Sequence, residues 1–398
     1  MLRIIKGSIT ELCDITKVFD SEYWLNDSSQ KILLPYIKST QELMNSTIQQ
    51  YDKNGVANII PSFDLGFSYN TGRIAGGFTT GMVVHWDSEV PFVPIDMTIK
   101  ECSGSVVSIS IDNIDFFNTE RINNCLQKMN NQGYRFNFKT GNHFISLYRD
   151  KNKRYYLVIH SGDDSYRDIN TGIYPSNEIW YKDQIKTSFD KTRSRYLNYL
   201  VDEYAERFVR IAINKRKDIA QFHRHLSEEI ILGYGSIENQ YTFQHYGFCF
   251  PNTAVLGTGF IKANEVFPIF SNEGLPIVIV KPTEKMWSVK VNNERRFVIP
   301  HGWGQDIRGI TNLSNQWQNG KIILTINDEI IAQDISYTSK LPRDIAQIRV
   351  LKDYESFING DISFEKCWNN KLYVDVVDIL YPCASYSDND KKTVLWEA

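Results

Sequence analysis

Most apolar stretches of this chain are short and rich in β-branched residues, and this feature restricts the fold more than any other in the sequence. Each stretch has the length of a strand and ends in turn-forming or charged residues, which is typical of β-structure. The clearest examples cover residues 106–111, 144–148, 155–159, 277–280, 322–326 and 373–379. Strands are therefore expected to form the framework, with helices inserted between them.

Helical periodicity is confined to two stretches. Behind Thr119, a suitable N-cap residue, one helix face is formed by Ile122, Cys125, Leu126 and Met129. A longer amphipathic stretch repeats apolar residues at Leu197, Val201, Tyr204, Phe208 and Ile211. Its basic residues are Arg193, Arg195, Arg207, Arg210, Lys215, Arg216 and Lys217. This predicted basic helix, an insertion over about 190–230, is either a solvated surface or one that meets an RNA backbone.

No internal repeat, low-complexity tract or Pro/Gly/Ser-rich linker divides the chain. We therefore predict a single α+β domain over residues 1–398, with central β-sheets and helical insertions. The net charge is only −3, from 44 basic and 47 acidic residues, which argues against coating of nucleic acid or membrane by bulk electrostatics. Without a long apolar segment or a disulfide-like cysteine pattern, we expect a cytoplasmic, monomeric protein that does not enter a membrane.

Two of the seven histidines are predicted to meet across a hairpin. His143 comes immediately before the strand at 144–148, and His160 closes the strand at 155–159. If these strands pair antiparallel, the start of one lies beside the end of the next. Taken singly, each histidine is best explained by an ordinary hydrogen-bonded structural role. Together, they place two imidazoles at one point.

Further candidate metal ligands surround this pair in the sequence. Asp96 and Cys102 flank the turn before the strand at 106–111, and His245 is a third histidine candidate. Imidazole, thiolate and carboxylate are the usual protein ligands of transition metals. His301 differs because Gly302 and Gly304 follow it, so that a large group can approach its ring, as a nucleophile requires.

The remaining histidines are expected to be structural. His223 and His225 are two residues apart, so on a helix they point in different directions, and both are predicted to lie on the surface. His85 is predicted to be packed, and Cys249 to be a core thiol.

The order of these residues resembles that of the RtcB RNA ligases. That family has a proline-aspartate-x-histidine stretch followed by Gly-Gly, an aspartate and a cysteine, a GNHF motif, a histidine-serine-glycine, a further histidine and an HGxGR loop. Here the matching positions are Pro61 with Gly76 and Gly77, Asp96 with Cys102, residues 141–144 (GNHF), residues 159–162 (IHSG), His245 and residues 301–305 (HGWGQ). The resemblance is clearest over about 61–387.

The resemblance implies a role for each position. Asp96, Cys102, His143, His160 and His245 would hold one or two Mn²⁺ ions, and His301 would accept a guanylate from GTP. Asn142, Lys262 and Gln305 would lie in the nucleotide site. The implied reaction joins RNA 3′-phosphate or 2′,3′-cyclic phosphate ends to 5′-hydroxyl ends, as in RNA repair or tRNA splicing, with an archease-type activator as a possible partner.

The departures from the family pattern concentrate on nucleotide recognition. Residues 61–64 read Pro-Ser-Phe-Asp, which indicates the loss of an acid near the metal. Ser146 replaces a glutamate that reads guanine, Leu351 a stacking tyrosine, and Gln305 the loop arginine. Such contacts set discrimination between bases, so a weakened preference for GTP is expected. Two alternatives use the same residues: a metal-dependent phosphodiesterase that acts on RNA ends, and a non-catalytic RNA-end binding protein that uses the predicted basic helix.

Overall fold

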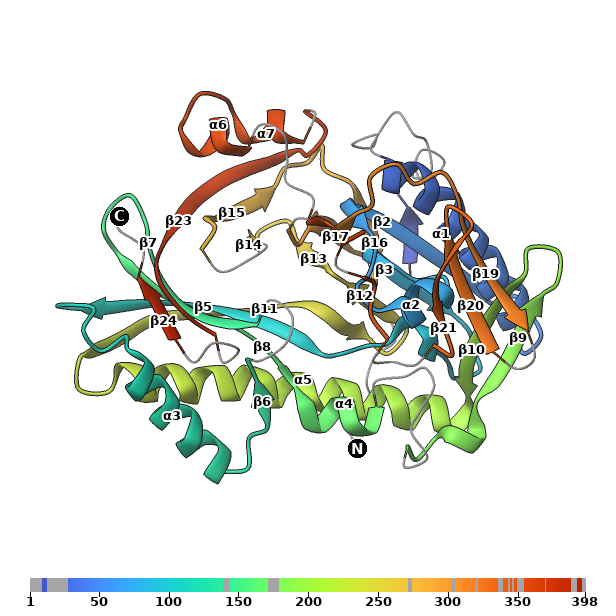
Figure 1. Ribbon diagram of the computed structural model, residues 1–398, viewed down its shortest axis with the longest axis horizontal. Helices are drawn as coiled ribbons and strands as arrows, with labels where there is room; N and C mark the ends of the chain where they lie inside the picture. Colours follow the sequence, from blue (N-terminus) through green and yellow to red (C-terminus); the bar gives the residue numbers. More distant parts are fainter. Residues whose placement is uncertain are drawn as a thin grey trace.

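The computed structural model describes residues 9–12, 28–138, 143–170, 179–270, 274–302, 305–318, 321–335, 339–342, 344–345, 347–348, 354–368, 370–387 and 392–395. It combines helices with many strands, which confirms the α+β class (Figure 1). Among these residues, no helix has both the length and the apolar character needed to cross a membrane.

A large antiparallel sheet runs through the centre of the molecule. In spatial order its strands are β14 (Phe267–Ile269), β15 (Ile277–Pro282), β23 (Val374–Ser387), β7 (Phe144–Arg149), β8 (Tyr155–Asp163), β5 (Cys102–Ile111), β11 (Gly235–Phe250), β12 (Thr253–Leu256), β3 (Thr80–Asp87) and β2 (Val56–Gly66). β24 (Lys392–Leu395) pairs with β23, and β6 (Phe136–Asn137) pairs with β8. Five of the six predicted strands lie in this sheet, and the sixth, at 322–326, lies in β20 of a smaller one.

Four smaller sheets complete the β-structure of the described residues. The first comprises β1 (Ile9–Leu12), β16 (Ser288–Val291), β17 (Glu294–Pro300) and β13 (Thr258–Lys262), and the second β4 (Phe92–Pro94), β10 (Arg195–Val201) and β9 (Lys186–Asp190). The third pairs β18 (Gln305–Asp306) with β22 (Gln347–Ile348), and the fourth comprises β19 (Leu313–Gln318), β20 (Lys321–Ile326) and β21 (Glu329–Gln333).

The helices are α1 (Ser28–Ile48), α2 (Thr71–Ala75), α3 (Thr119–Asn131), α4 (Asp164–Asn170), α5 (Asp202–Ile231), α6 (Tyr354–Ile358) and α7 (Phe364–Cys367), with 3₁₀ turns η3 (Ile95–Met97) and η4 (Lys182–Gln184).

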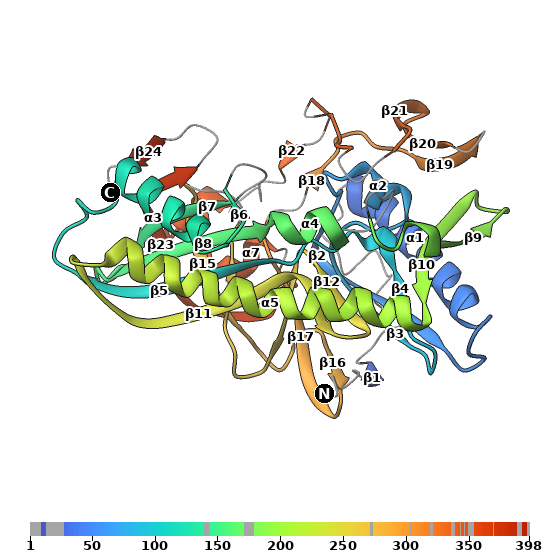
Figure 2. The ribbon, with the colours of Figure 1, turned by 90° about the horizontal axis from the view of Figure 1, so that it is seen from below.

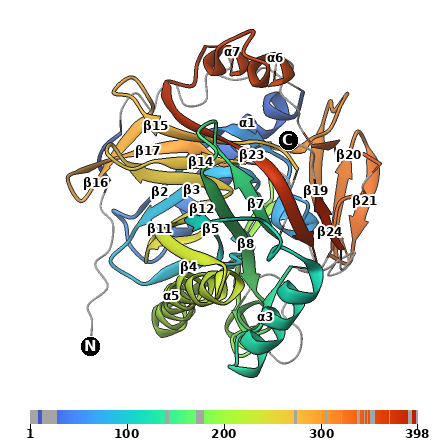
Figure 3. The same cartoon turned by 90° about the vertical axis from the view of Figure 1, so that its left-hand side faces the viewer.

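The long helix α5 and the shorter α3 cover one face of the strands β5, β7 and β8 (Figure 2). Side chains alternate between the two faces of a strand, so Val107 and Ile159 point toward these helices and pack with Phe222 of α5. The neighbouring residues in each strand face the opposite way, into the main core. Figure 3 shows the same layering from one end, with α5 and α3 below the sheet. This alternation decides which side chains form the site described below.

The predicted basic helix begins later than its pattern indicated and ends where the insertion was expected to end, at Ile231. Residues 195–201 form the strand β10, and α5 starts only at Asp202, whose φ of 54° breaks the helical path. Leu197 and Val201 therefore lie in a strand. Their spacing of four suited a helix, but pairing of β10 with both β4 and β9 determines the local structure.

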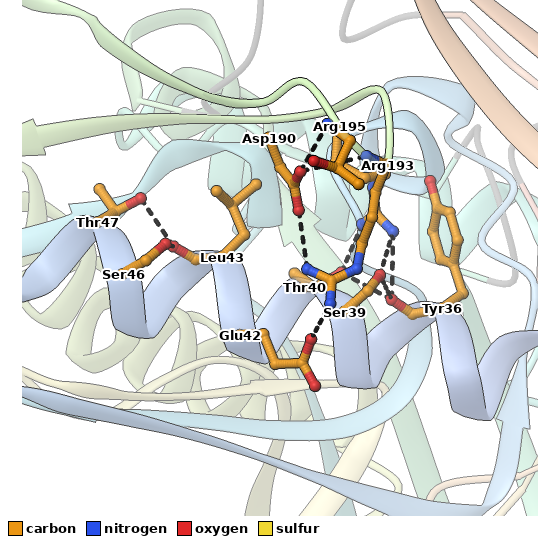
Figure 4. A network of polar contacts seen from close by, with 11 residues as sticks. Tyr36, Ser39, Thr40, Glu42, Leu43, Ser46, Thr47, Asp190, Arg193 and Arg195 are labelled. Atoms are coloured by element: carbon orange, nitrogen blue, oxygen red, sulfur yellow. Dashed lines mark hydrogen bonds and ion pairs between the residues drawn. The ribbon is translucent and has the colours of Figure 1, made fainter.

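The arginines at the start of that stretch hold a hairpin against α1 rather than forming a free basic surface (Figure 4). The Arg195 guanidinium lies 3.8 Å above the Tyr36 ring and donates hydrogen bonds to the hydroxyls of Ser39 and Thr40, at 2.7 and 2.6 Å. Arg193 forms ion pairs with Glu42, at 2.7 Å, and with Asp190, at 2.8 Å. Of the same seven basic residues, Lys215 pairs with Asp163, Arg216 donates to the Phe248 carbonyl and Arg207 lies over the Trp180 ring, so at least five are engaged within the fold.

Candidate metal centre

The pairing of β5 with β8 brings Cys102 next to His160. Cys102 opens β5 opposite Gly162, and Gly104 lies opposite His160. The two side chains share the face turned away from α5, and the Cys102 Sγ lies 3.1 Å from the His160 Nε2. Both residues are buried.

His143 joins this pair from the neighbouring strand. It directly precedes β7, whose first residue, Phe144, pairs with His160 in an antiparallel register. The His143 Nε2 is 3.3 Å from the Cys102 Sγ, and the ligand atoms of Cys102, His143 and His160 all lie within 4.8 Å of one another. The predicted meeting of two imidazoles across the hairpin is confirmed. Groups that share one ion through bonds of about 2.0–2.3 Å lie roughly 3–4 Å apart, so these three can hold a metal ion.

His245 extends the group from β11. Its Nε2 is 3.0 Å from the Nε2 of His160, and its side chain is buried. In the described part of the chain, its Nδ1 has no hydrogen-bond partner. A buried imidazole that makes no ordinary hydrogen bond with that nitrogen is suited to cation binding. We call Cys102, His143, His160 and His245 the histidine–thiol cluster.

His301 stacks against His245 of this cluster. It follows β17, and its ring lies almost parallel to that of His245, with 4.6 Å between centroids and 17° between planes. Phe270 contacts the rings of His160, His245 and His301, so it fixes their spacing. The side chain of His301 is 14% exposed, more than those of the cluster histidines, which leaves an approach from outside.

Asp64 holds the loop that carries His301. The motif comparison had indicated that residues 61–64 lack the acid that the family has near the metal. The Asp64 Oδ2 accepts hydrogen bonds from the backbone N–H groups of His301, at 2.9 Å, and Gly302, at 3.1 Å, and lies 3.9 Å from the His301 Nδ1. The pairing of β2 with β3 shifts register between Pro61 and Gly66, and this irregular stretch includes Asp64. An acid displaced from the motif position thus reaches the site; its nearness to Pro61 was the available signal.

Asp96 does not join the cluster, so its predicted convergence with Cys102 is wrong. Its carboxylate accepts the backbone N–H of Asn198, at 2.7 Å, and the side-chain amide of the same residue, at 3.0 Å. The left-handed backbone of Thr98, with φ of 44°, turns the chain after η3, and Gly76 packs directly against Asp96. Burial raises the pKa of this carboxyl to about 7.

Lys262 lies in an ion pair instead of beside the cluster. Its Nζ is 2.7 Å from the Glu294 carboxylate. Thr258 pairs with Pro300 next to His301, whereas Lys262 pairs with Arg296 four positions further along the ladder, roughly 13 Å away at the rise of a strand. Gln305 opens β18 opposite Ile348, but its side chain, and all of Asn142, lie outside the described residues. Leu351 also lies outside them.

His223 is fully buried, so its predicted surface position is wrong. It lies on the face of α5 that covers β5 and β8, and its ring contacts the hydroxyls of Ser105, at 2.9 Å, and Ser161, at 2.8 Å. The Ser161 carbonyl in turn accepts from the Cys102 thiol at 3.3 Å. His225 is half-buried and contacts the Tyr134 hydroxyl at 3.0 Å. His85, buried against Thr253, is packed as predicted.

Burial keeps the ionisable groups of the site in their neutral forms. It lowers the pKa of His143 and His245 well below the usual value and that of His301 to about 3, and it raises the pKa of the Cys102 thiol to about 12. Neutral imidazole is the form that binds metals and attacks electrophiles.

Lys100 and Arg167 act electrostatically on Cys102 and His143 of the cluster. Burial and the neighbouring charges of Arg73 and Arg167 lower the pKa of Lys100 to about 7. The buried Arg73 donates its hydrogen bonds to uncharged oxygens of Ser68, Met97, Thr98 and Tyr246. A positive potential of this kind favours an anionic ligand.

No protein-family model matches this chain, and comparison with curated proteins finds no match either. Its function must therefore be inferred from the geometry of the site.

Proposed function

We propose that this protein is a metal-dependent RNA ligase that joins 3′-phosphate or 2′,3′-cyclic phosphate ends to 5′-hydroxyl ends through a nucleotidyl-histidine at His301. The observation that carries the proposal is the stacking of His301, a partly exposed imidazole, on His245 of the buried histidine–thiol cluster. The order of these residues also resembles that of the RtcB RNA ligases.

The surroundings of His301 suit a nucleophile. Its backbone N–H is held by Asp64 and its carbonyl accepts from the backbone N–H of Phe270, at 2.9 Å, so the residue is fixed at both ends. The Nδ1 faces the Asp64 carboxylate, which leaves the Nε2 lone pair for attack. Asp64 would then stabilise the positive charge that develops on the ring as it reacts.

The reaction can be written with these groups. The Nε2 of His301 attacks the α-phosphorus of a nucleoside triphosphate, the bond to pyrophosphate breaks, and a phosphoramidate forms. An oxygen of an RNA 3′-phosphate, released from a cyclic phosphate by water where necessary, then displaces His301 from the nucleotide. The 5′-hydroxyl of the second RNA end attacks the activated 3′-phosphate, and the nucleoside monophosphate leaves.

The remaining components follow from residue chemistry and from the resemblance. A divalent ion held by the cluster would neutralise charge on the phosphoryl oxygens. Lys100, Arg73 and Arg167 add positive potential near the cluster, which suits polyphosphate and RNA ends. The resemblance implies Mn²⁺ as the ion, GTP as the nucleotide and an archease-type activator, in a cytoplasmic monomer.

Detection of the nucleotide adduct tests the proposal directly. The purified protein is incubated with a divalent ion and each of the four nucleoside triphosphates in turn, and its intact mass is measured. We expect the mass to rise by one nucleoside monophosphate, and the adduct to be absent in His301→Ala but present in the matched variant His225→Ala. If none of the four nucleotides gives an adduct, the ligase proposal is wrong.

A metal-dependent phosphodiesterase is the second candidate, because the cluster is well formed while Lys262, an expected nucleotide contact, lies elsewhere and Ser146 stands where the resemblance implies a glutamate that reads guanine. Lys262 is paired with Glu294, and Ser146 donates a hydrogen bond to Ser385. Hydrolysis of a cyclic phosphate by metal-activated water would need the cluster but not His301. Retention of cyclic-phosphate hydrolysis in His301→Ala, without an adduct in the wild type, would support this candidate.

A further inference from the structure

We infer that the histidine–thiol cluster selects a single zinc-class ion, such as Zn²⁺ or Co²⁺, in preference to Mn²⁺. This inference rests on the proposed function, since both use the same site, but it concerns which ion the residues themselves favour. Three observations lead to it: the identity of the donors, the positions of the neighbouring acids, and the support behind the ligands.

The donors are one sulfur and several imidazole nitrogens. In the described part of the chain, no carboxylate oxygen joins the group formed by Cys102, His143 and His160. His245 adds a third imidazole, with its Nε2 3.0 Å from that of His160. Thiolate and imidazole suit Zn²⁺ and its neighbours in the first transition series, whereas Mn²⁺ is better served by carboxylate, carbonyl and water oxygens.

The acids near these ligands in sequence are occupied elsewhere. Both oxygens of Asp96 accept from Asn198. Glu101, next to Cys102, accepts from the backbone N–H of Phe248, at 3.1 Å, and from the Gln244 amide, at 2.7 Å. Asp163, at the end of β8, accepts from Ser165 and forms an ion pair with Lys215 at 3.3 Å. None of these three carboxylates is left to bridge a second ion, which favours a single ion.

The support behind the ligands fixes this soft donor set in place. Ser161 directly follows His160 in β8, and its hydroxyl is held by the ring of His223 in α5. Such partners orient ligands and so tune the affinity for metal. The set is therefore built into the sheet and into the helix that covers it.

Direct measurement of metal affinity tests the inference without any need for activity. The whole protein is stripped with a chelator, and Zn²⁺ and Mn²⁺ are titrated in competition with an indicator. We expect one Zn²⁺ per chain, bound on the order of 10³-fold more tightly than Mn²⁺. Co²⁺ should give the near-ultraviolet absorption of a thiolate–Co²⁺ bond. Comparable affinities for Zn²⁺ and Mn²⁺, or a Co²⁺ spectrum without the thiolate band, would overturn the inference.

Substitution at Cys102 sharpens the test. Cys102→Asp replaces the sulfur by oxygen and should lower the Zn²⁺-to-Mn²⁺ affinity ratio by about tenfold or more, whereas Cys125→Ser, on α3, should leave it unchanged. If the aspartate variant does not fold, the Co²⁺ spectrum of the wild type still decides. An adduct supported by Mn²⁺ without zinc preference would refute the inference and keep the proposed function. A preference for zinc without a nucleotide adduct would keep the inference and refute the proposed function.

Discussion

Asp96 and Cys102 are close neighbours in the sequence, yet they belong to two buried polar regions of opposite character. Around Asp96, acceptors meet donors, because both carboxylate oxygens receive hydrogen bonds from Asn198. Around Cys102, a thiol and three imidazoles lie in contact with one another, and within the described residues no carboxylate joins the thiol and its two nearest histidines. The first arrangement stabilises the fold by itself, whereas the second costs free energy of burial that a bound cation would offset.

The largest effect is expected from removal of a ligand. His160 is closest to the centre of the cluster, since it contacts both Cys102 and His245. His160→Ala should weaken metal binding by on the order of 10³-fold, well beyond the 10–100-fold typical of supporting residues. Isothermal titration with Zn²⁺ and Mn²⁺ measures this. Unchanged affinity for both ions would show that the two regions do not differ as argued.

The complementary substitution should act on stability alone. Asp96→Ala leaves the backbone N–H and the side-chain amide of the buried Asn198 without their acceptor. At about 1–3 kcal/mol for each unsatisfied group, a loss of about 3 kcal/mol in the free energy of unfolding is expected, measured by urea denaturation. Metal affinity should stay within about twofold of the wild type. A decrease like that of His160→Ala would mean that Asp96 is a ligand after all.

The contrast also explains which parts of the site could be predicted from the sequence. Cys102, His143, His160 and His245 lie in or next to strands, where pairing fixes the positions of side chains, so strand patterns were enough to bring the histidines of the hairpin together. Asp96 lies in a 3₁₀ turn before a left-handed residue. Turns of this kind carry no periodicity, and nearness in sequence was a poor guide to direction.

The helical region also shows what a sequence pattern cannot decide. The periodicity of α5 was evident, but its start was placed too early because Leu197 and Val201 of β10 happened to continue the spacing. His223 and His225 were judged by their separation alone. Which of them is buried depends on the strands that α5 covers, and only the packing of the helix on β5 and β8 could decide that.

A smaller effect on the metal is expected from His223, behind the cluster. His223→Phe keeps a buried ring but removes the hydrogen bonds to Ser105 and Ser161, and so loosens the segment that carries His160. A loss of about 10-fold in metal affinity is expected. His225→Phe, on the same helix, is the matched control and should leave affinity unchanged. Equal effects of the two variants would assign the change to the helix as a whole.

The smallest effect concerns His85, a buried histidine that, like Asp96, has a hydrogen-bond partner outside the cluster. Its Nδ1 lies 2.8 Å from the Thr253 hydroxyl. Burial lowers the pKa of His85 to about 4 in the folded protein. In the unfolded chain this histidine takes up a proton near its usual pKa of about 6.5, so between these two pH values only the unfolded chain is protonated there. Its contribution to stability is complete above the higher of these two values and is lost as the pH falls toward 4. Between pH 7 and 5.5 the wild type should lose about 1 kcal/mol more than His85→Gln, as measured by urea denaturation at each pH. Parallel curves for the two proteins would mean that the pKa of His85 is not lowered in the folded protein, and this prediction would then be wrong.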